Sequence, residues 1–254
     1  SPEDLPVAKE LTRAYFLPDK RDATDNDVLK RMIMENGGIY SAVMGGDDYL
    51  NKKTMAHYYN GGQAPNHAIT IVGWDDDYSR KNFKTTPQGD GAWICKNSWG
   101  TNWGTQGGYY YVSYYDKNIG TQNSQYILKD LNPNEKIWQY DKLGMTSQVG
   151  LGEESYYANV FGPVKEDTYL TNVGLWTSAN NTSIKIGKME FAGYEKVKVE
   201  DTFIPKGSKF AVIVRMKTPG YKYPIPIERP IKGFSSKVTA DPGQSFVSKE
   251  GEKW

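Results

Sequence analysis

The sequence predicts an α+β protein dominated by β-strands, and three observations support that fold class. The 254 residues include 19 Tyr and 7 Trp, and aromatic side chains are enriched in strands. The 26 Gly residues can supply tight turns between short strands. One segment, residues 26–36, places apolar side chains at helical spacing. We therefore expect one helix followed by strands, in a chain long enough for two domains.

The first half of the chain is predicted to contain one amphipathic helix and a strand meander. The helix covers residues 26–36, with Asp25 or Asn26 as its N-cap and Gly37-Gly38 as its end. Residues 75–91 form a polar loop. Apolar and aromatic runs bounded by turn residues predict strands at residues 39–45, 67–75, 91–99 and 107–116.

The composition becomes polar, with a proline, at residues 129–137, and we place a domain boundary there. The first domain then covers residues 1–130 and the second covers residues 136–254. In the second domain, short apolar runs alternate with Gly, Asn and Pro turns, which is typical of an antiparallel β-sandwich. The runs are YYANVFG, YLTNVGLWTS, TSIKIGKMEF and SKFAVIVRMKT.

Charge and cysteine content exclude several classes of protein. The 31 Lys and Arg residues nearly balance 30 Asp and Glu residues, so no strong field attracts nucleic acid or an anionic membrane. No apolar run approaches the roughly 18–20 residues that span a bilayer, and no signal peptide is visible. The single cysteine, Cys95, has no partner for an internal disulfide. Two distant histidines and one cysteine make no zinc site.

Two segments carry the residues best suited to chemistry. In NHAITIVGWDDD, residues 66–77, His67 begins a strand directly after a loop, where its ring can face a cleft. In AWICKNSWGTNWG, residues 92–104, Asn97 lies in an apolar aromatic run, where an unpaired amide costs about 1–3 kcal/mol. A ring N–H of His67 is a suitable partner, and it would fix the tautomer and leave the other nitrogen as a base.

These two segments resemble the histidine and asparagine segments of papain-like cysteine peptidases, and the resemblance covers about residues 10–116. It implies a right-hand, β-barrel subdomain and a Cys-His-Asn mechanism. In that mechanism His67 is the general base and Asn97 orients its ring. Trp99 shields the His–Asn pair from water. The resemblance implies a protein or peptide substrate and a mechanism that requires no cofactor.

The sequence departs from the family pattern because no cysteine precedes His67. The family places its nucleophile in a CGSCW-like segment upstream of the histidine. We interpret Cys95 as a buried small hydrophobe, since it lies within a strand and alternation points Lys96 to the other face. We expect the chain to be the C-terminal part of a peptidase, partnered by its N-terminal half. A peptidase relic that lost its nucleophile, or a nucleophile supplied by a separate processed chain, are the alternatives.

The second domain resembles the lectin-like β-sandwich of certain bacterial and archaeal surface cysteine peptidases, over about residues 136–254. The resemblance implies a role with cell-envelope carbohydrate, and a secreted or cell-surface location in a prokaryote. It leaves open whether this domain binds a calcium ion, and no residue is assigned as a calcium ligand. A non-catalytic adhesin or glycan-binding protein is therefore the competing function. Aromatic side chains that could stack on sugar rings, or fill the core, are Trp138, Tyr140, Tyr156, Tyr157 and Trp176.

Two further groups of residues are weaker candidates. His57, in KTMAHYYNGG, is expected to pack beside Tyr58 and Tyr59, and these two tyrosines are candidates for substrate contact because family members have a tyrosine near this point. Three consecutive aspartates, Asp75–Asp77, suggest calcium, but such a run in a loop is ordinarily solvated.

Overall fold

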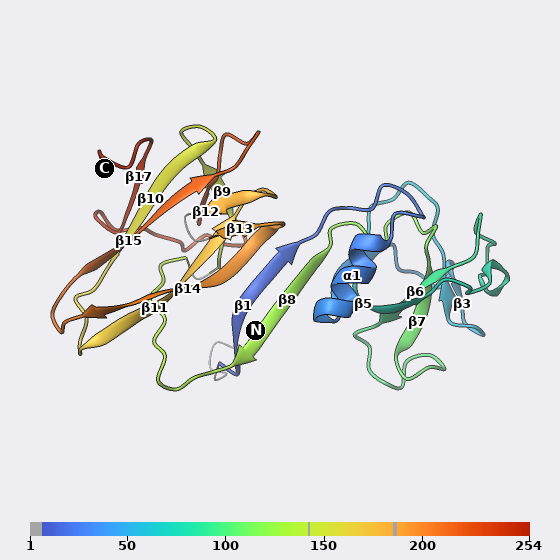
Figure 1. Ribbon diagram of the computed structural model, residues 1–254. Helices are drawn as coiled ribbons and strands as arrows, with labels where there is room; N and C mark the ends of the chain where they lie inside the picture. The colour runs from blue at the N-terminus through green and yellow to red at the C-terminus, as the bar shows by residue number, and fades with distance from the viewer. Residues whose placement is uncertain (1–6, 142, 185–186) are drawn as a thin grey trace. The chain divides into compact units, whose positions relative to one another are not determined.

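The computed structural model describes residues 7–141, 143–184 and 187–254 (Figure 1). It is rich in strands and contains one α-helix among these residues, which confirms the predicted strand-rich α+β class. The chain divides into two compact units: Phe16–Tyr126 forms one, and Ser1–Tyr15 together with Ile127–Trp254 forms the other.

The elements are the helix α1 (Asp27–Asn36), the 3-10 turn η1 (Arg80–Asn82), and the strands β1 (Lys9–Phe16), β2 (Ile39–Val43), β3 (Leu50–Asn51), β4 (Ala56–His57), β5 (His67–Asp75), β6 (Ala92–Lys96), β7 (Tyr109–Ser113), β8 (Ser124–Asp130), β9 (Ser147–Val149), β10 (Glu154–Phe161), β11 (Thr168–Thr177), β12 (Thr182–Ile184), β13 (Gly187–Met189), β14 (Ala192–Ile204), β15 (Phe210–Lys217), β16 (Ile225–Ile227) and β17 (Ser245–Ser248).

In the unit Phe16–Tyr126, the helix α1 packs against β5 and β2. Asn26, one of the two predicted N-cap residues, is the N-cap but makes no side-chain capping bond. The helix ends at Gly37, whose φ of 91° and N–H bond to the Ile33 carbonyl form a left-handed end that suits glycine. Leu29, Met32 and Ile33 are its buried residues and face the sheet core.

The strands of this unit follow the order β2-β5-β6-β7-β4-β3. β5 pairs antiparallel with both β2 and β6, with Val43 opposite His67 and Lys96 opposite Thr70. Because β5 and β6 run in opposite directions, the start of β5 and the end of β6 lie at the same edge of the sheet. That edge is where His67 and Asn97 occur, and the register therefore brings the two segments together.

The unit formed by Ser1–Tyr15 and Ile127–Trp254 contains antiparallel β-sheets. One has the order β13-β12-β15-β10-β17, a second contains β11-β14-β1-β8, and β16 pairs with β9. Apolar side chains from strands of both larger sheets form a common core, as expected for packed sheets. The core residues are Leu175, Ile184, Met189, Val214 and Met216, with Tyr157, Val197 and Val212 packed against them.

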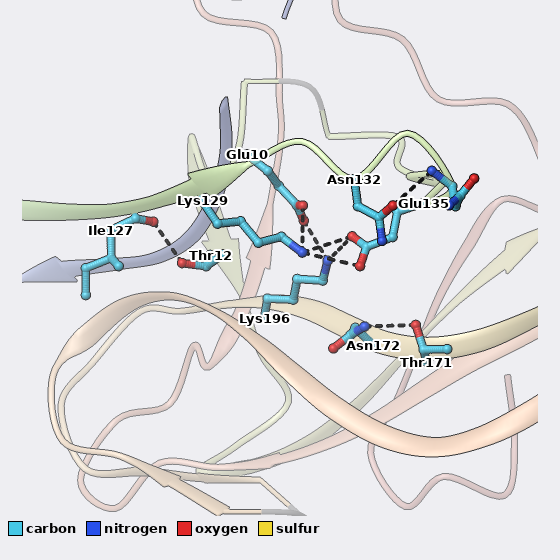
Figure 2. Close-up of polar contacts among 10 residues, drawn as sticks. Glu10, Thr12, Ile127, Lys129, Asn132, Glu135, Thr171, Asn172 and Lys196 are labelled. Atoms are coloured by element: carbon cyan, nitrogen blue, oxygen red, sulfur yellow. Dashed lines mark hydrogen bonds and ion pairs between the residues drawn. The ribbon is translucent and has the colours of Figure 1, made fainter. Parts of the chain in front are cut away.

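Four charged side chains in this unit form a closed set of alternating ion pairs (Figure 2). Lys196 on β14 lies 2.7 Å from Glu10 on β1 and 2.9 Å from Glu135. Lys129 on β8 lies 3.2 Å from Glu10 and 3.0 Å from Glu135. Each cation therefore contacts both carboxylates, and this ion-pair ring links β1, β8 and β14. Hydrogen bonds from Lys196 and then Lys129 lower the pKa of Glu135 to about 2.

Replacing Glu135 by glutamine is expected to remove a stabilising effect that depends on pH. The pKa of a glutamate in an unfolded chain is about 4.3, so the depressed folded-state pKa stabilises the protein above that pH and ceases to do so as the pH falls toward 2. Because Glu135 is partly exposed, we expect about 1 kcal/mol near pH 7, or about 2–4 °C in Tm. Thermal unfolding between pH 7 and pH 3 measures both.

The control is Glu200→Gln, on the exposed side of the same strand β14. We expect the Tm of this variant to follow that of the parent at every pH. The Tm difference between Glu135→Gln and the parent should instead shrink as the pH falls. A Tm difference that stays constant from pH 7 to pH 3 would contradict the assigned role of the ionised carboxylate.

All the strands predicted in the first half form, and three of them are shorter than predicted, since β2 ends at Val43, β6 ends at Lys96 and β7 covers Tyr109–Ser113. In the second half, the run predicted at 182–191 contains two antiparallel strands, with Thr182 opposite Met189. The 13-residue strand β14 was not predicted, because its charged residues break the apolar pattern. β1 was missed for the same reason.

Candidate active site

His67 and Asn97 form a hydrogen-bonded pair at the sheet edge. The Nε2 atom of His67 lies 3.0 Å from Oδ1 of Asn97. The same oxygen accepts the backbone N–H of Ser98 at 2.8 Å, and the backbone N–H of Asn97 donates to the Gly108 carbonyl at 2.9 Å. An amide oxygen only accepts hydrogen bonds, so Nε2 carries the proton and Nδ1 presents a lone pair. The sequence predicted this pairing and its consequence for the tautomer.

Trp99 lies against the His67 ring, with the ring centroids 5.2 Å apart and the planes tilted by 41°. The indole is itself 61 % exposed, so it covers one side of the histidine while its outer face meets solvent. The indole of Trp103 packs edge-on against Trp99 at 5.5 Å, and Tyr110 packs against Trp103 at 5.3 Å. These aromatic contacts, beyond Trp99, were not predicted from the sequence, although Trp103 stands in the same Gly-Trp segment.

The backbone before β5 is held by Asn66, the neighbour of His67. The Asn66 N–H donates to the Val43 carbonyl at 3.1 Å, and its side-chain oxygen accepts the Gly45 N–H at 2.7 Å. Gly45 lies so close to the histidine that a Cβ at this position would be 3.1 Å from the Cβ of His67. The connection after β2 therefore packs directly on the candidate base, and glycine permits this approach.

A cavity of about 50 Å³ adjoins the His67–Asn97 pair. Backbone from the connection after β2 and rings from the 97–110 segment form its walls. The lining residues are Val43, Gly45, Gly46, Asp47, Leu50, His57, His67, Asn97, Trp99, Trp103 and Tyr110. The pair thus borders a small hollow with both apolar and polar walls.

Cys95 is not placed to act on this site. It is fully buried in β6 and pairs across the sheet with Ile71, four residues along β5 from His67. Burial, together with the nearby charge of Asp116, raises the pKa of the Cys95 thiol well above its ordinary value. A thiol that resists ionisation is a poor nucleophile. The structure agrees with its interpretation as a buried hydrophobe.

The surroundings of His57 differ from the prediction. His57 is 3 % exposed, and its ring packs edge-on against Tyr49 and Tyr110 rather than beside Tyr58 and Tyr59. Tyr58 follows His57 directly in the extended chain and points to the other side, whereas Tyr59 packs on Tyr49, which in turn contacts the His57 ring. Tyr58 and Tyr59 are themselves buried, at 7 % and 5 % exposure, which leaves little surface for substrate contact.

The other candidate residues from the sequence form no second functional site among the residues that the structure describes. Asp76, in the aspartate run, accepts hydrogen bonds from Lys30 at 2.5 Å and from the Tyr114 hydroxyl at 2.8 Å. Within the described residues, no group of three or more His, Cys, Asp or Glu side chains is arranged to hold a metal ion. No helix in that part of the chain has the length and apolarity to cross a membrane. Of the five aromatic candidates for sugar stacking, Trp138 is exposed.

Comparison with known families adds two matches. Residues 9–128 match the papain family of cysteine proteases, and residues 137–187 and 184–254 match the lectin-like domain. A probable cysteine proteinase of Invertebrate iridescent virus 6 is 30% identical over 133 residues, covering 46% of this chain and 22% of the viral protein. Fruit bromelain of Ananas comosus is 44% identical over 59 residues, covering 20% of this chain and 14% of bromelain.

Solved structures of similar fold include the cysteine protease and lectin-like domains of Cwp84, a surface-layer associated protein of Clostridium difficile. That structure is 25% identical, with a TM-score of 0.81, and the match covers 98% of this chain and 59% of the solved chain. A second structure, Cwp84 after propeptide cleavage, gives the same TM-score at 24% identity, covering 96% and 66% of the two chains. The chain therefore spans under two thirds of the solved protein it matches.

The family matches coincide with the site geometry, since the His67–Asn97 pair and its aromatic neighbours all lie within residues 9–128. The chain therefore carries a papain-family cysteine protease domain over residues 9–128 and a lectin-like domain over residues 137–254.

Proposed function

We propose that this chain supplies the general base and the orienting amide of a cysteine peptidase that hydrolyses peptide bonds. The observation that carries the proposal is the 3.0 Å contact between Nε2 of His67 and Oδ1 of Asn97, beside the cavity. The nucleophilic thiolate lies outside residues 1–254, because Cys95 is buried and distant in register from His67. A segment that belongs to the N-terminal half of the same peptidase supplies it.

In this mechanism, Nδ1 of His67 first takes the proton of the incoming cysteine thiol, which leaves a thiolate beside an imidazolium. The thiolate attacks the peptide carbonyl carbon, and the imidazolium gives its proton to the leaving amine. A water molecule, deprotonated by His67, then hydrolyses the thioester and releases the thiolate. Asn97 holds the ring throughout by accepting a hydrogen bond from the Nε2–H group, and Trp99 limits access of water to that bond. The steps consist of proton transfers and of nucleophilic attacks on a carbonyl carbon, and none of them needs a cofactor.

The test is the activity of residues 1–254 alone toward a peptidyl-aminomethylcoumarin substrate. We expect no turnover, because the raised pKa and burial of Cys95 leave the chain without a reactive thiolate. Adding the segment that supplies the upstream cysteine is expected to restore turnover sensitive to iodoacetamide. Turnover by residues 1–254 that disappears on alkylation and in the Cys95→Ala variant would contradict the proposal and make Cys95 the nucleophile.

For the lectin-like domain we propose an association with cell-envelope carbohydrate. Support comes from the family match and from Cwp84, which is described as a surface-layer associated protein. By the same likeness we propose a cell-surface or secreted location in a prokaryote. The division of the chain between residues 130 and 136, and a calcium ion in the second domain, remain predictions.

The burial of the chain's single cysteine also favours a second function, a peptidase-like adhesin that binds glycans without catalysis. A glycan array probed with the whole chain separates the two. Binding of defined glycans together with a parent protein that has no cysteine upstream of His67 would favour the adhesin. Thiol-dependent proteolysis by the parent would favour the peptidase.

A further inference from the structure

The second histidine, His57, lies in the wall of the cavity that His67 also lines. Its Nε2 atom is 3.0 Å from the backbone carbonyl oxygen of Met44. Its Nδ1 atom makes no hydrogen bond but lies 3.3 Å from Oδ2 of Asp116. Both side chains are buried, with 4% and 0% exposure. Both nitrogens of this buried ring therefore face oxygen atoms.

The partners of these two nitrogens determine where the protons are. A carbonyl oxygen only accepts, so Nε2 of His57 carries a hydrogen. Asp116 accepts backbone N–H groups from Tyr59 at 2.8 Å, Asn118 at 3.0 Å and Ile119 at 3.1 Å, and such bonds favour the ionised carboxylate. A lone pair on Nδ1 facing that carboxylate would be repelled, whereas an N–H would be attracted. The arrangement fits an imidazolium paired with a carboxylate.

The other titratable groups around this pair leave the assignment in place. Burial raises the pKa of Tyr110 well above its ordinary value, so its hydroxyl is neutral beside the ring. Cys95 is neutral for the same reason. Tyr49 contributes an aromatic edge. Burial lowers the pKa of Lys20 to about 8, and Asp116 opposes that shift from a distance, while the ammonium itself donates to the Tyr114 carbonyl.

The Met44 carbonyl belongs to the connection that packs on His67. Val43 pairs with His67 across the β2–β5 ladder, and Gly45 lies against its Cβ. Asn66 makes hydrogen bonds to the backbone of Val43 and of Gly45, and His57 makes one to the backbone of Met44, which lies between them. The three successive residues Val43, Met44 and Gly45 are thus held by hydrogen bonds from Asn66, which is next to the candidate base, and from His57.

We propose that His57 is a positioning residue for His67. Its imidazolium, paired with Asp116, holds the Met44 carbonyl and with it the connection against which His67 packs. The effect of this role on catalysis rests on the proposed peptidase function. The positive charge of His57 and its hydrogen bond to the Met44 carbonyl do not depend on that function. Nothing in the role requires His57 to touch substrate, and its burial prevents that.

The protonation state can be tested by ¹⁵N NMR of the imidazole rings in the full chain, which has two histidines. Assignment uses His57→Gln and His67→Ala. At pH 7 we expect both ring nitrogens of His57 to carry a directly bonded hydrogen, with slow exchange. A single unprotonated nitrogen in the His57 ring at pH 7 would overturn the imidazolium assignment.

The positioning role can be tested by amide hydrogen exchange at Gly45 and Asn66. We expect exchange at these two amides to accelerate by about tenfold or more in His57→Phe, which removes both the donor and the charge. His57→Gln, which keeps an N–H donor, should show a smaller acceleration and serves if the phenylalanine variant does not fold. Unchanged protection at both amides in a folded variant would overturn the role.

The matched control is Gln125→Met, since the buried Gln125 amide donates to the Gly37 carbonyl just before the start of β2, as His57 donates just after its end. This variant should accelerate exchange near Gly37 and leave Gly45 and Asn66 protected. Equal acceleration at all these amides in both variants would mean general destabilisation and would count against the proposal. None of these readouts needs turnover, so a failure of the peptidase function and a failure of this role are separable.

Discussion

Replacing His67 by alanine is expected to lower the kcat/KM of the nucleophile-containing peptidase by at least about a thousandfold, because in the proposed mechanism the same ring activates the thiol and protonates the leaving amine. The half-buried position of His67 at the start of β5 means that the fold should survive the change. The measurement is hydrolysis of a peptidyl-aminomethylcoumarin substrate, with Tm recorded for each variant.

The control for this experiment is Cys95→Ala, which changes a fully buried side chain away from the site. With the nucleophile outside residues 1–254, we expect this variant to retain its activity apart from any loss of folded protein. If His67→Ala were fully active, or if Cys95→Ala were inactive while folded, the assignment of the base or of the missing nucleophile would be wrong.

Replacing Asn97 by alanine is expected to have a smaller effect, about tenfold to a hundredfold in kcat/KM. Asn97 transfers no proton, and the loss of one hydrogen bond that orients the ring corresponds to about 1–3 kcal/mol. The remaining activity should follow a changed pH profile, because the tautomer of His67 is no longer fixed by the amide. Initial rates from pH 5 to pH 9 measure both effects.

Asn123→Ala is the matched control for Asn97→Ala. Asn123 is another buried asparagine of the same unit, whose amide donates to the Gly120 carbonyl at 2.8 Å. Its replacement should lower stability to a similar degree and leave the pH profile unchanged. A loss in Asn97→Ala as complete as that in His67→Ala would mean that the amide does more than orient the ring.

The sequence was most informative where chemistry and strand pattern coincided. The stretch around His67 predicted both the strand His67–Asp75 and the position of His67 at its start, and an amide in an apolar run predicted that Asn97 needs a partner. Cys95 and Lys96 alternate between buried and exposed, as the period of a strand requires. These predictions depend on local pattern, on the resemblance to a known family, and on the cost of an unpaired polar group.

What the sequence could not predict depends on long-range register. The pairing of His57 with Asp116 joins residues 59 positions apart in the chain, through the parallel contact of β4 with β7. The two-residue strands β3 and β4 carry no readable period. Likewise, the apolar alternation of β1 is weakened by Lys, Glu and Arg, whose partners appear only after folding.

The ion-pair ring of Glu10, Lys129, Glu135 and Lys196 has a consequence for how the protein can be divided. It lies in a compact unit that takes most of β1 from the papain-family match, β14 from the lectin-like match, and residues 127–130 of β8, which run past the end of the papain-family match. A cut between residues 130 and 136 would therefore leave the 13-residue β14 with one side unpaired and a lysine without its carboxylate from β1. Such an edge invites association between copies, so a lectin-like fragment for binding work is better designed with β1 and β8 attached.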